Sequence, residues 1–339
     1  MRSTKSPSST RPGGLSWWQK ALGFEPVPAP PHVFGLDARS LRYGQFVRDR
    51  QGFRLRGWRE SALPSDAFHA GLLGGPLRDP VAFEALVGGL VRGVPGGLKE
   101  AALVLPDAWL RVTFSEITDV PRQAQARDDV LRWKLRRLVP FRVDELRVSA
   151  VEVEPLPVQE EPRRLLMGFG VEQLLAQIED AFAAHGVRLG RITNSSLALL
   201  SAVELPASSG FAAVVQVETE GYTLIFARNG EPVLHRFKPF TGGGIGGGDA
   251  AHAGYVTRDL KLTRNFLDEN FAGAPLGQVL LLAPPAAEPM WLDRLQEGLG
   301  SSVAPVDGRH LPSLRSEDPV APSWRELAPM LGAVRQEVA

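Results

Sequence analysis

The chain has 339 residues, which suits two lobes or one large domain with an insertion. Lysine and arginine together number 38, as do aspartate and glutamate, so no overall charge attracts nucleic acid or an anionic membrane. Cysteine is absent, which excludes disulfides, thiolate metal sites and cysteine nucleophiles. The six histidines lack the spacings of metal ligands, so we expect no metal site and no nucleic-acid partner. With no apolar segment long enough to span a bilayer or direct secretion, a cytoplasmic location is expected.

Residues 1–32 are rich in serine, proline and arginine, a composition that predicts a disordered lead-in. Trp17 and Trp18 interrupt this segment. Two interpretations of the pair stay open: it anchors the chain to a partner or a membrane interface, or it folds back onto the domain.

Short apolar runs between turn residues predict a meander of three strands at 33–37, 43–47 and 53–58. Asp79 before Pro80 predicts the start of a helix that ends near residue 92. Further strands are expected at 101–105, 110–117, 146–153 and 165–169, with a helix over about 121–138. Apolar residues at helical spacing from Val171 to Phe182 predict another helix, and Asn194 or Ser195 can cap a shorter one.

A loop at 206–210 separates the two halves of the chain. Beyond it, Asn229-Gly230 predicts a tight hairpin turn. Strands are expected at 211–217, 222–226, 233–237 and 279–282, and helices at 255–270, 291–299 and 324–338. Because strands alternate with helices and a meander opens each half, we predict an α/β protein of two related lobes.

Residues 131–147 carry an excess of basic side chains within an otherwise neutral chain. Leu131, Leu135 and Leu138 lie at helical spacing, so the pattern favours the solvated face of an amphipathic helix. The alternative interpretation is a surface for an acidic partner or a membrane.

The glycine-rich loop at 242–248 fits the pattern G-x-G-x-x-G, but six glycines in seven residues fit almost any glycine pattern. No Lys-Ser/Thr pair follows, and Asp249 would repel a phosphate at the start of the next helix. A hinge or connecting loop is the favoured interpretation, and a phosphate cradle is the alternative. Ser195 and Ser196 stand at a helix start, where capping explains serine better than nucleophilic chemistry.

Three segments together point to a family. They are residues 33–40, with the sequence VFGLDARS; Leu105-Pro106-Asp107; and residues 130–145, in which Trp133, Pro140-Phe141 and Asp144-Glu145 recur in register. These segments resemble the PilM proteins, the actin-like cytoplasmic components of type IV pilus machines, which are also similar to the cytoplasmic part of GspL.

The resemblance implies an actin-like (ribonuclease H-like) fold of two lobes around a nucleotide cleft, with an α/β subdomain inserted in the first lobe. On this basis we expect the first lobe at 33–208, with the insertion at about 98–168. The second lobe is expected at 209–305, and a C-terminal segment at 306–339 returns to the core.

In such folds two turns hold the phosphates of ATP. The first turn keeps Asp37 and Ser40, which we interpret as relics of a phosphate site, but Arg39 replaces a glycine and Gly44 stands at the usual lysine position. The second turn, D-I-G in the family, reads Gln216-Val217-Glu218. A metal-facing acid is therefore lost, and the Glu218 carboxylate would oppose a phosphate by like charge.

The adenosine segment of the family reads Ala283-Pro284-Pro285-Ala286 here, and the two prolines remove backbone N–H donors. Gly243 and Gly244 are the remaining candidates for a cofactor contact. We therefore expect no catalytic residues and no enzyme activity, with binding of ATP and Mg²⁺ lost or very weak. An active actin-like ATPase is the alternative.

The resemblance also implies a scaffold at the inner face of the cytoplasmic membrane. It would bind the N-terminal tail of a PilN-like inner-membrane protein in a groove between the first lobe and the insertion, with other pilus platform proteins or the assembly ATPase as further partners. An extended tail needs apolar pockets and a strand edge, and Trp133 and Phe141 are the candidate contacts. A GspL-like component of type II secretion is the alternative.

Overall fold

The computed structural model describes residues 29–64, 67–68, 76–118, 121, 123–139, 142–153, 163–205, 210–240, 250–271, 275–317 and 322–335. Most of the lead-in, Phe141, Gly243 and Gly244 lie outside these residues, so the predictions made for them are left as they stand. No helix in the described part of the chain is long and apolar enough to cross a bilayer.

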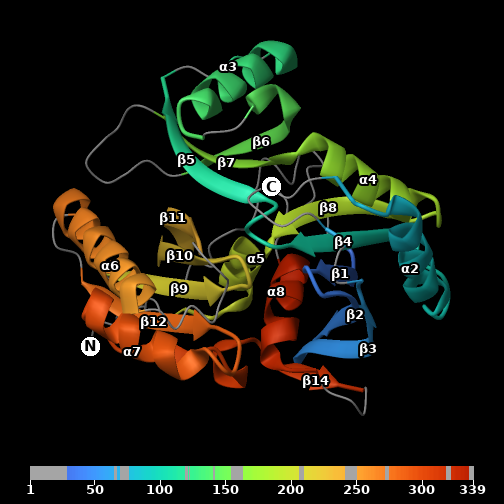
Figure 1. The fold of residues 1–339 in the computed structure, drawn as a ribbon. Coiled ribbons are helices and arrows are strands. Elements are labelled where there is room, and N and C mark those ends of the chain that lie inside the picture. Colours follow the sequence, from blue (N-terminus) through green and yellow to red (C-terminus); the bar gives the residue numbers. More distant parts are fainter. Residues whose placement is uncertain are drawn as a thin grey trace, which may run out of the picture.

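The first lobe is built on a six-stranded sheet with the order β14-β3-β2-β1-β4-β8 (Figure 1). Its strands are β1 (His32–Leu36), β2 (Ser40–Asp49), β3 (Gly52–Ala62), β4 (Glu100–Leu105), β8 (Arg188–Asn194) and β14 (Leu314–Ser316). β1, β2 and β3 form the predicted antiparallel meander, and β4 and β8 join it in parallel. Helices α2 (Pro80–Arg92) and α4 (Glu172–Ala183) pack on one face through a shared apolar core.

The second lobe has a five-stranded sheet with the order β11-β10-β9-β12-β13. Its strands are β9 (Phe211–Val217), β10 (Gly221–Arg228), β11 (Glu231–Pro239), β12 (Leu276–Leu282) and β13 (Val303–Pro305). A second meander therefore opens this half, as predicted. Helices α6 (Ala250–Asn270) and α7 (Glu288–Leu299) cover one face, with the short helix η2 (Gly308–His310) further along the chain.

A pair of helices fills the space between the two sheets. α5 (Ser195–Ala202) and α8 (Trp324–Arg335) contact each other closely, and their side chains pack on the first sheet on one side and on the second sheet on the other (Figure 1). The contact is so close that a Cβ at Gly332 would lie 1.7 Å from the carbonyl oxygen of Ala198. The fold is thus α/β/α/β/α, with one helical layer shared by both lobes.

A third, three-stranded sheet with the order β5-β7-β6 forms a subdomain that projects from the first lobe. It comprises β5 (Arg111–Ile117), α3 (Ala124–Arg136), η1 (Val143–Glu145), β6 (Leu146–Val153) and β7 (Arg163–Val171). Helix α3 covers one face of this sheet through an apolar core of its own. The sequence places the start of the insertion near residue 98, whereas β4 pairs with β1 and β8 inside the first sheet, so the subdomain begins after Leu105.

Local sequence signals explain several element boundaries. The side chain of Asp79 accepts a hydrogen bond from the Ala82 N–H, which caps α2 ahead of Pro80. Asn194 caps α5 in the same way through the Leu197 N–H. Asn229 and Gly230 both adopt positive φ, 54° and 84°, as the tight turn between β10 and β11 requires.

Candidate functional site

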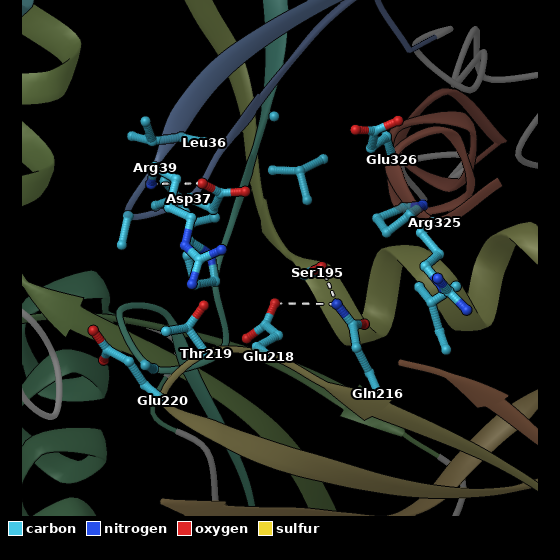
Figure 2. Close-up of a pocket in the computed structure, with 18 of the residues that line it drawn as sticks. Leu36, Asp37, Arg39, Ser195, Gln216, Glu218, Thr219, Glu220, Arg325 and Glu326 are labelled. Carbon is cyan, nitrogen blue, oxygen red and sulfur yellow. Dashed lines mark hydrogen bonds between the residues drawn. The ribbon is translucent and has the colours of Figure 1, made fainter. Parts of the chain in front are cut away.

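A cleft of about 290 Å³ lies where the two lobes meet. The turn after β1 and the turn after β9 face each other across it, and the start of α8 closes one side (Figure 2). Its walls include Asp37, Arg39, Arg42, Trp109, Gln216, Glu218, Glu220, Pro284, Arg325 and Met330. This is the position at which the family resemblance places the nucleotide.

In the first turn, the carboxylate of Asp37 is fully engaged by the protein itself. Its Oδ1 accepts hydrogen bonds from the N–H groups of Arg39, at 2.7 Å, and Ser40, at 2.9 Å. Its Oδ2 forms an ion pair with Arg42, at 2.7 Å. Asp37 therefore shapes the link between β1 and β2. Ser40 is buried, is not among the residues that line the cleft, and its hydroxyl has no hydrogen-bond partner in the described part of the chain.

The second turn is occupied by the carboxyl group of Glu218. Its Oε2 accepts a hydrogen bond from the Asp107 N–H at 2.9 Å, and its Oε1 accepts one from Gln216 Nε2 at 3.1 Å (Figure 2). Burial, and next the nearby charge of Asp107, raise the pKa of Glu218 well above its usual range. A protonated Glu218 repels phosphate less than a charged one, so the like-charge argument from the sequence is weakened. What opposes a phosphate is that the Glu218 side chain itself stands in the cleft, held there by the Asp107 N–H of the first lobe.

The segment that follows β12 forms the start of helix α7. The carbonyl oxygen of Pro284 accepts hydrogen bonds from the N–H groups of Ala287 and Glu288, both at 3.0 Å. Ala283 and Pro284 line the cleft, but Pro284 brings no N–H that could contact a base. This wall of the cleft is therefore an apolar surface.

A buried polar network joins the two lobes behind the cleft. Asp107, which follows β4 of the first lobe, has no exposed surface. Its Oδ1 accepts a hydrogen bond from the Ser196 N–H of α5 at 3.0 Å, and its Oδ2 accepts one from the Thr223 hydroxyl of β10 at 2.5 Å. Because Thr223 belongs to the second lobe, one carboxylate fastens both lobes to the central helix.

Ser196 and His235 extend this network, but their geometry is not that of a hydrolase. His235 Nε2 lies 2.9 Å from the Ser196 hydroxyl and 3.8 Å from Asp107 Oδ2, so serine and aspartate approach the same ring nitrogen. In a catalytic triad they contact opposite nitrogens of the ring. All three residues are also buried, and burial lowers the pKa of His235 to about 4. Ser195 and Ser196 do stand at a helix start, as predicted, but Asn194 caps α5, and the two serine hydroxyls form hydrogen bonds with Gln216 and His235 instead.

A second cavity, of about 260 Å³, lies between the inserted subdomain and the first lobe. We call it the subdomain groove. It is lined by Leu110, Val112, Arg147, Ser149, Ala150, Val151, Leu166, Gly168, Leu175, Ile192, Thr193, Asn194 and Leu197. The lining is mostly apolar, and the charge of Arg147 is balanced by ion pairs with Glu172 and Glu179.

Two strands that stand at the ends of their sheets border the subdomain groove. β6 ends the three-stranded sheet, and β8 ends the six-stranded sheet. Val151 of β6 is 58% exposed, and a Cβ at Gly168 of β7 would meet no atom within 4 Å. The groove is thus open, mostly apolar and bordered by edge strands, which suits an extended peptide.

No known family model matches the chain, and no curated protein sequence matches it significantly. Among solved structures, a chain of the PilM-PilN type IV pilus biogenesis complex superimposes with a TM-score of 0.69 at 14% identity, covering 91% of this chain and 98% of that one. This chain has the same fold. The cytoplasmic domain of EpsL, an inner-membrane component of the type II secretion system of Vibrio cholerae, matches with a TM-score of 0.48 at 10% identity, over 91% and 95% of the two chains. The predicted PilM-like, actin-like architecture of two lobes is confirmed at the level of the fold.

Within the PilM-like fold, the candidate residues do not form one site. Asp37 lies in the cleft, whereas Trp133 lies on the outer side of α3, 52% exposed, with Lys134 Nζ and Arg137 Cζ 5.5 and 5.7 Å from its ring. Leu165, Met167 and Phe169 of β7 face α3, and Leu166 and Gly168 between them face the groove. Trp133 and the groove are therefore on opposite faces of the sheet.

The residues that the sequence left unassigned are those of the buried network. Thr223 and His235 are more than 100 positions from Asp107, and nothing in their local sequence links them. Asp107 is the only one of these three residues that the sequence singled out, as part of the Leu105-Pro106-Asp107 segment of the family resemblance. The described residues contain no cluster of histidine and acidic side chains that could hold a metal ion.

Proposed function

We propose that this protein is a scaffold of a type IV pilus assembly machine, and that it binds the cytoplasmic tail of a PilN-like inner-membrane protein in the subdomain groove. The observation that carries the proposal is the groove itself, open and apolar, on a fold shared with a chain of the PilM-PilN complex. The proposed location is the inner face of the cytoplasmic membrane, reached through that partner. Other platform proteins or the assembly ATPase are proposed as further partners.

The groove offers an extended tail two kinds of contact. Leu110, Val112 and Leu166 form an apolar floor, which takes alternate side chains of a strand. Because β6 and β8 stand at the ends of their sheets in the described part of the chain, an extended tail can add beside either of them as a further strand. Both contacts depend on an extended, largely uncharged segment, so the partner's recognition sequence should be short and apolar.

The cleft supports a role without catalysis. Asp37 is held by two N–H groups and Arg42, and Glu218 occupies the N–H of Asp107, so the groups that would hold Mg²⁺ and phosphate are engaged within the protein. The Asp107 network fastens the lobes without a nucleotide between them. We propose a degenerate nucleotide site in which the actin-like lobes serve as a rigid support for the groove.

The test is a binding titration with a fluorescently labelled peptide that carries the N-terminal tail of the PilN-like protein. A Cβ at Gly168 would meet no atom within 4 Å, so we expect Gly168→Leu to keep the fold while its side chain fills the groove. We expect wild type to bind saturably and the variant to lose about 10-fold or more in affinity, since the apolar floor is covered. Gly89→Leu, on the exposed face of α2, adds the same side chain elsewhere and should bind as wild type does. Equal binding by all three proteins would refute the groove as the site.

A further inference from the structure

The outer face of α3 combines an exposed tryptophan with basic side chains. Of the large apolar side chains exposed in the described chain, two fall here, Trp133 on the helix and Leu138 just after it, each 52% exposed. The other tryptophans of the described residues are buried or half-buried. Because Leu131 and Leu135 face the core of the subdomain, Trp133 lies on the opposite side of the helix. Helix α3 itself lies at the outer side of the molecule (Figure 1).

The cations beside Trp133 fall into two groups. Arg136 and Arg142 form ion pairs with Asp144 and Glu145, at 3.7 and 2.9 Å. Lys134 and Arg137 form no ion pair with a carboxylate within the described residues: Lys134 donates to the carbonyl of Glu116, and Arg137 approaches the indole. Arg132 donates to the carbonyls of Val143 and Leu146, and its charge also acts on the carboxylate of Glu172.

The acidic residues of α3, Asp128 and Asp129, lie nearer its N-terminus than these cations. The C-terminal half of the helix and the turn after it therefore keep uncompensated positive charge around an exposed indole.

We infer that this face of α3 contacts the anionic surface of a bilayer. Tryptophan prefers the headgroup level, where its ring is half in an apolar environment and its N–H remains wet. Nearby lysine and arginine side chains are attracted by anionic headgroups. The chain, neutral overall, thus carries on α3 a local surface that fits a lipid interface. An acidic protein surface would complement the charges, but it would not account for the exposed indole between them.

The inference rests on the proposed function for its biological setting, and the geometry of the two sites is compatible. The three-stranded sheet and α3 separate the subdomain groove from the bilayer-facing surface. A helix layer and a sheet layer together measure about 20 Å, which an extended tail crosses with about six residues. A membrane partner held in the groove would keep α3 close to the bilayer. The high effective concentration would then strengthen a contact that is weak alone.

The test uses vesicles and the full chain without any partner protein. We expect the chain to float with vesicles of phosphatidylethanolamine and phosphatidylglycerol at low salt, to float less at high salt, and not to float with phosphatidylcholine alone. Trp133→Ala and Arg137→Gln should each lower the bound fraction about threefold to tenfold. Val81→Ala, at an exposed apolar position on α2, is the control that should bind as wild type does.

Brominated lipid then shows whether the indole enters the interface. Its bromine quenches tryptophan fluorescence at short range, so wild type should be quenched clearly more than Trp133→Phe. Absence of flotation on anionic vesicles, or equal flotation and quenching in the Trp133 variants, would overturn the inference. Failure of the tail peptide to bind the groove would instead refute the proposed function, because the vesicle experiment contains no partner.

Discussion

The carboxyl group of Glu218 accepts a hydrogen bond from the backbone N–H of Asp107, 2.9 Å away, across the junction of the two lobes. In this way a side chain of the second lobe occupies a donor of the first at the place where the fold would otherwise admit an anion. Asp107 in turn holds Ser196 and Thr223 through its own carboxylate. The lobes are therefore connected by protein groups alone.

The first prediction concerns Glu218 and alkaline pH. Because burial raises its pKa, the folded state retains a proton that the unfolded state loses above about pH 4.5. The contribution of Glu218 to stability is thus lost as pH rises from there through its folded pKa. Glu218→Gln removes this titration, so it should raise the melting temperature at pH 8 by a few degrees and leave it nearly unchanged at pH 4. Thermal melts across this range test it; an unchanged pH profile in the variant would contradict the assigned pKa.

The second prediction concerns His235 and acid. Its folded pKa is lowered to about 4, mainly by burial, while the unfolded pKa is near 6.5. The unfolded state therefore binds more protons between these values, and stability falls as pH drops from 6.5 to 4. Chemical shifts of the His235 ring followed by NMR should show a neutral imidazole at pH 6. A His235 ring that is protonated at pH 6 would show that the network is open to solvent.

The third prediction concerns nucleotide. Calorimetric titration of the wild-type chain with Mg-ATP, at concentrations that detect a millimolar dissociation constant, should give no saturable heat. The reason is that Asp37 and Glu218 are engaged by protein donors and Pro284 brings no N–H to the cleft. A titration with Mg²⁺ alone corrects for metal binding. Saturable heat with ATP would instead support the alternative, an active actin-like ATPase.

The fourth prediction concerns the shared helical layer. Gly332→Ala would place a Cβ 1.7 Å from the carbonyl oxygen of Ala198, so α5 and α8 must move apart. We expect the free energy of unfolding in urea to fall by about 1–3 kcal/mol. Gly254→Ala, on α6, meets no atom within 4 Å and should be neutral or slightly stabilising. If both variants were equally stable, α5 and α8 would be able to move apart at little cost, which would contradict the close packing described here.

The sequence predicted most of what is local in this fold. Asp79 before Pro80 and the pair Asn229-Gly230 specify their helix start and turn by capping and by positive φ, and both are seen. The start of the insertion was misplaced because the segment at 98–105 reads as a strand, and only long-range pairing with β1 assigns it to the first sheet. The Asp107 network could not be predicted, since its members meet only after both lobes have packed on α5.

The candidate site was predicted in part. The cleft lies where Asp37 and Glu218 were expected to meet, but their interactions with Arg42 and the Asp107 N–H depend on distances that no motif encodes. Trp133 was chosen because it recurs in a family motif, and exposure on α3 places it away from the groove. Its role as a contact for the partner tail remains a prediction.

The central claim is that the partner tail lies in the subdomain groove, and the absence of cysteine makes a direct test simple. Val151→Cys, in the groove, and Trp133→Cys, on the outer face of α3, introduce single thiols at similarly exposed positions. Each variant is coupled to a photo-crosslinker and irradiated with the PilN-like tail peptide. The account predicts crosslinking from position 151 and little from position 133; efficient crosslinking from 133 with none from 151 would contradict it.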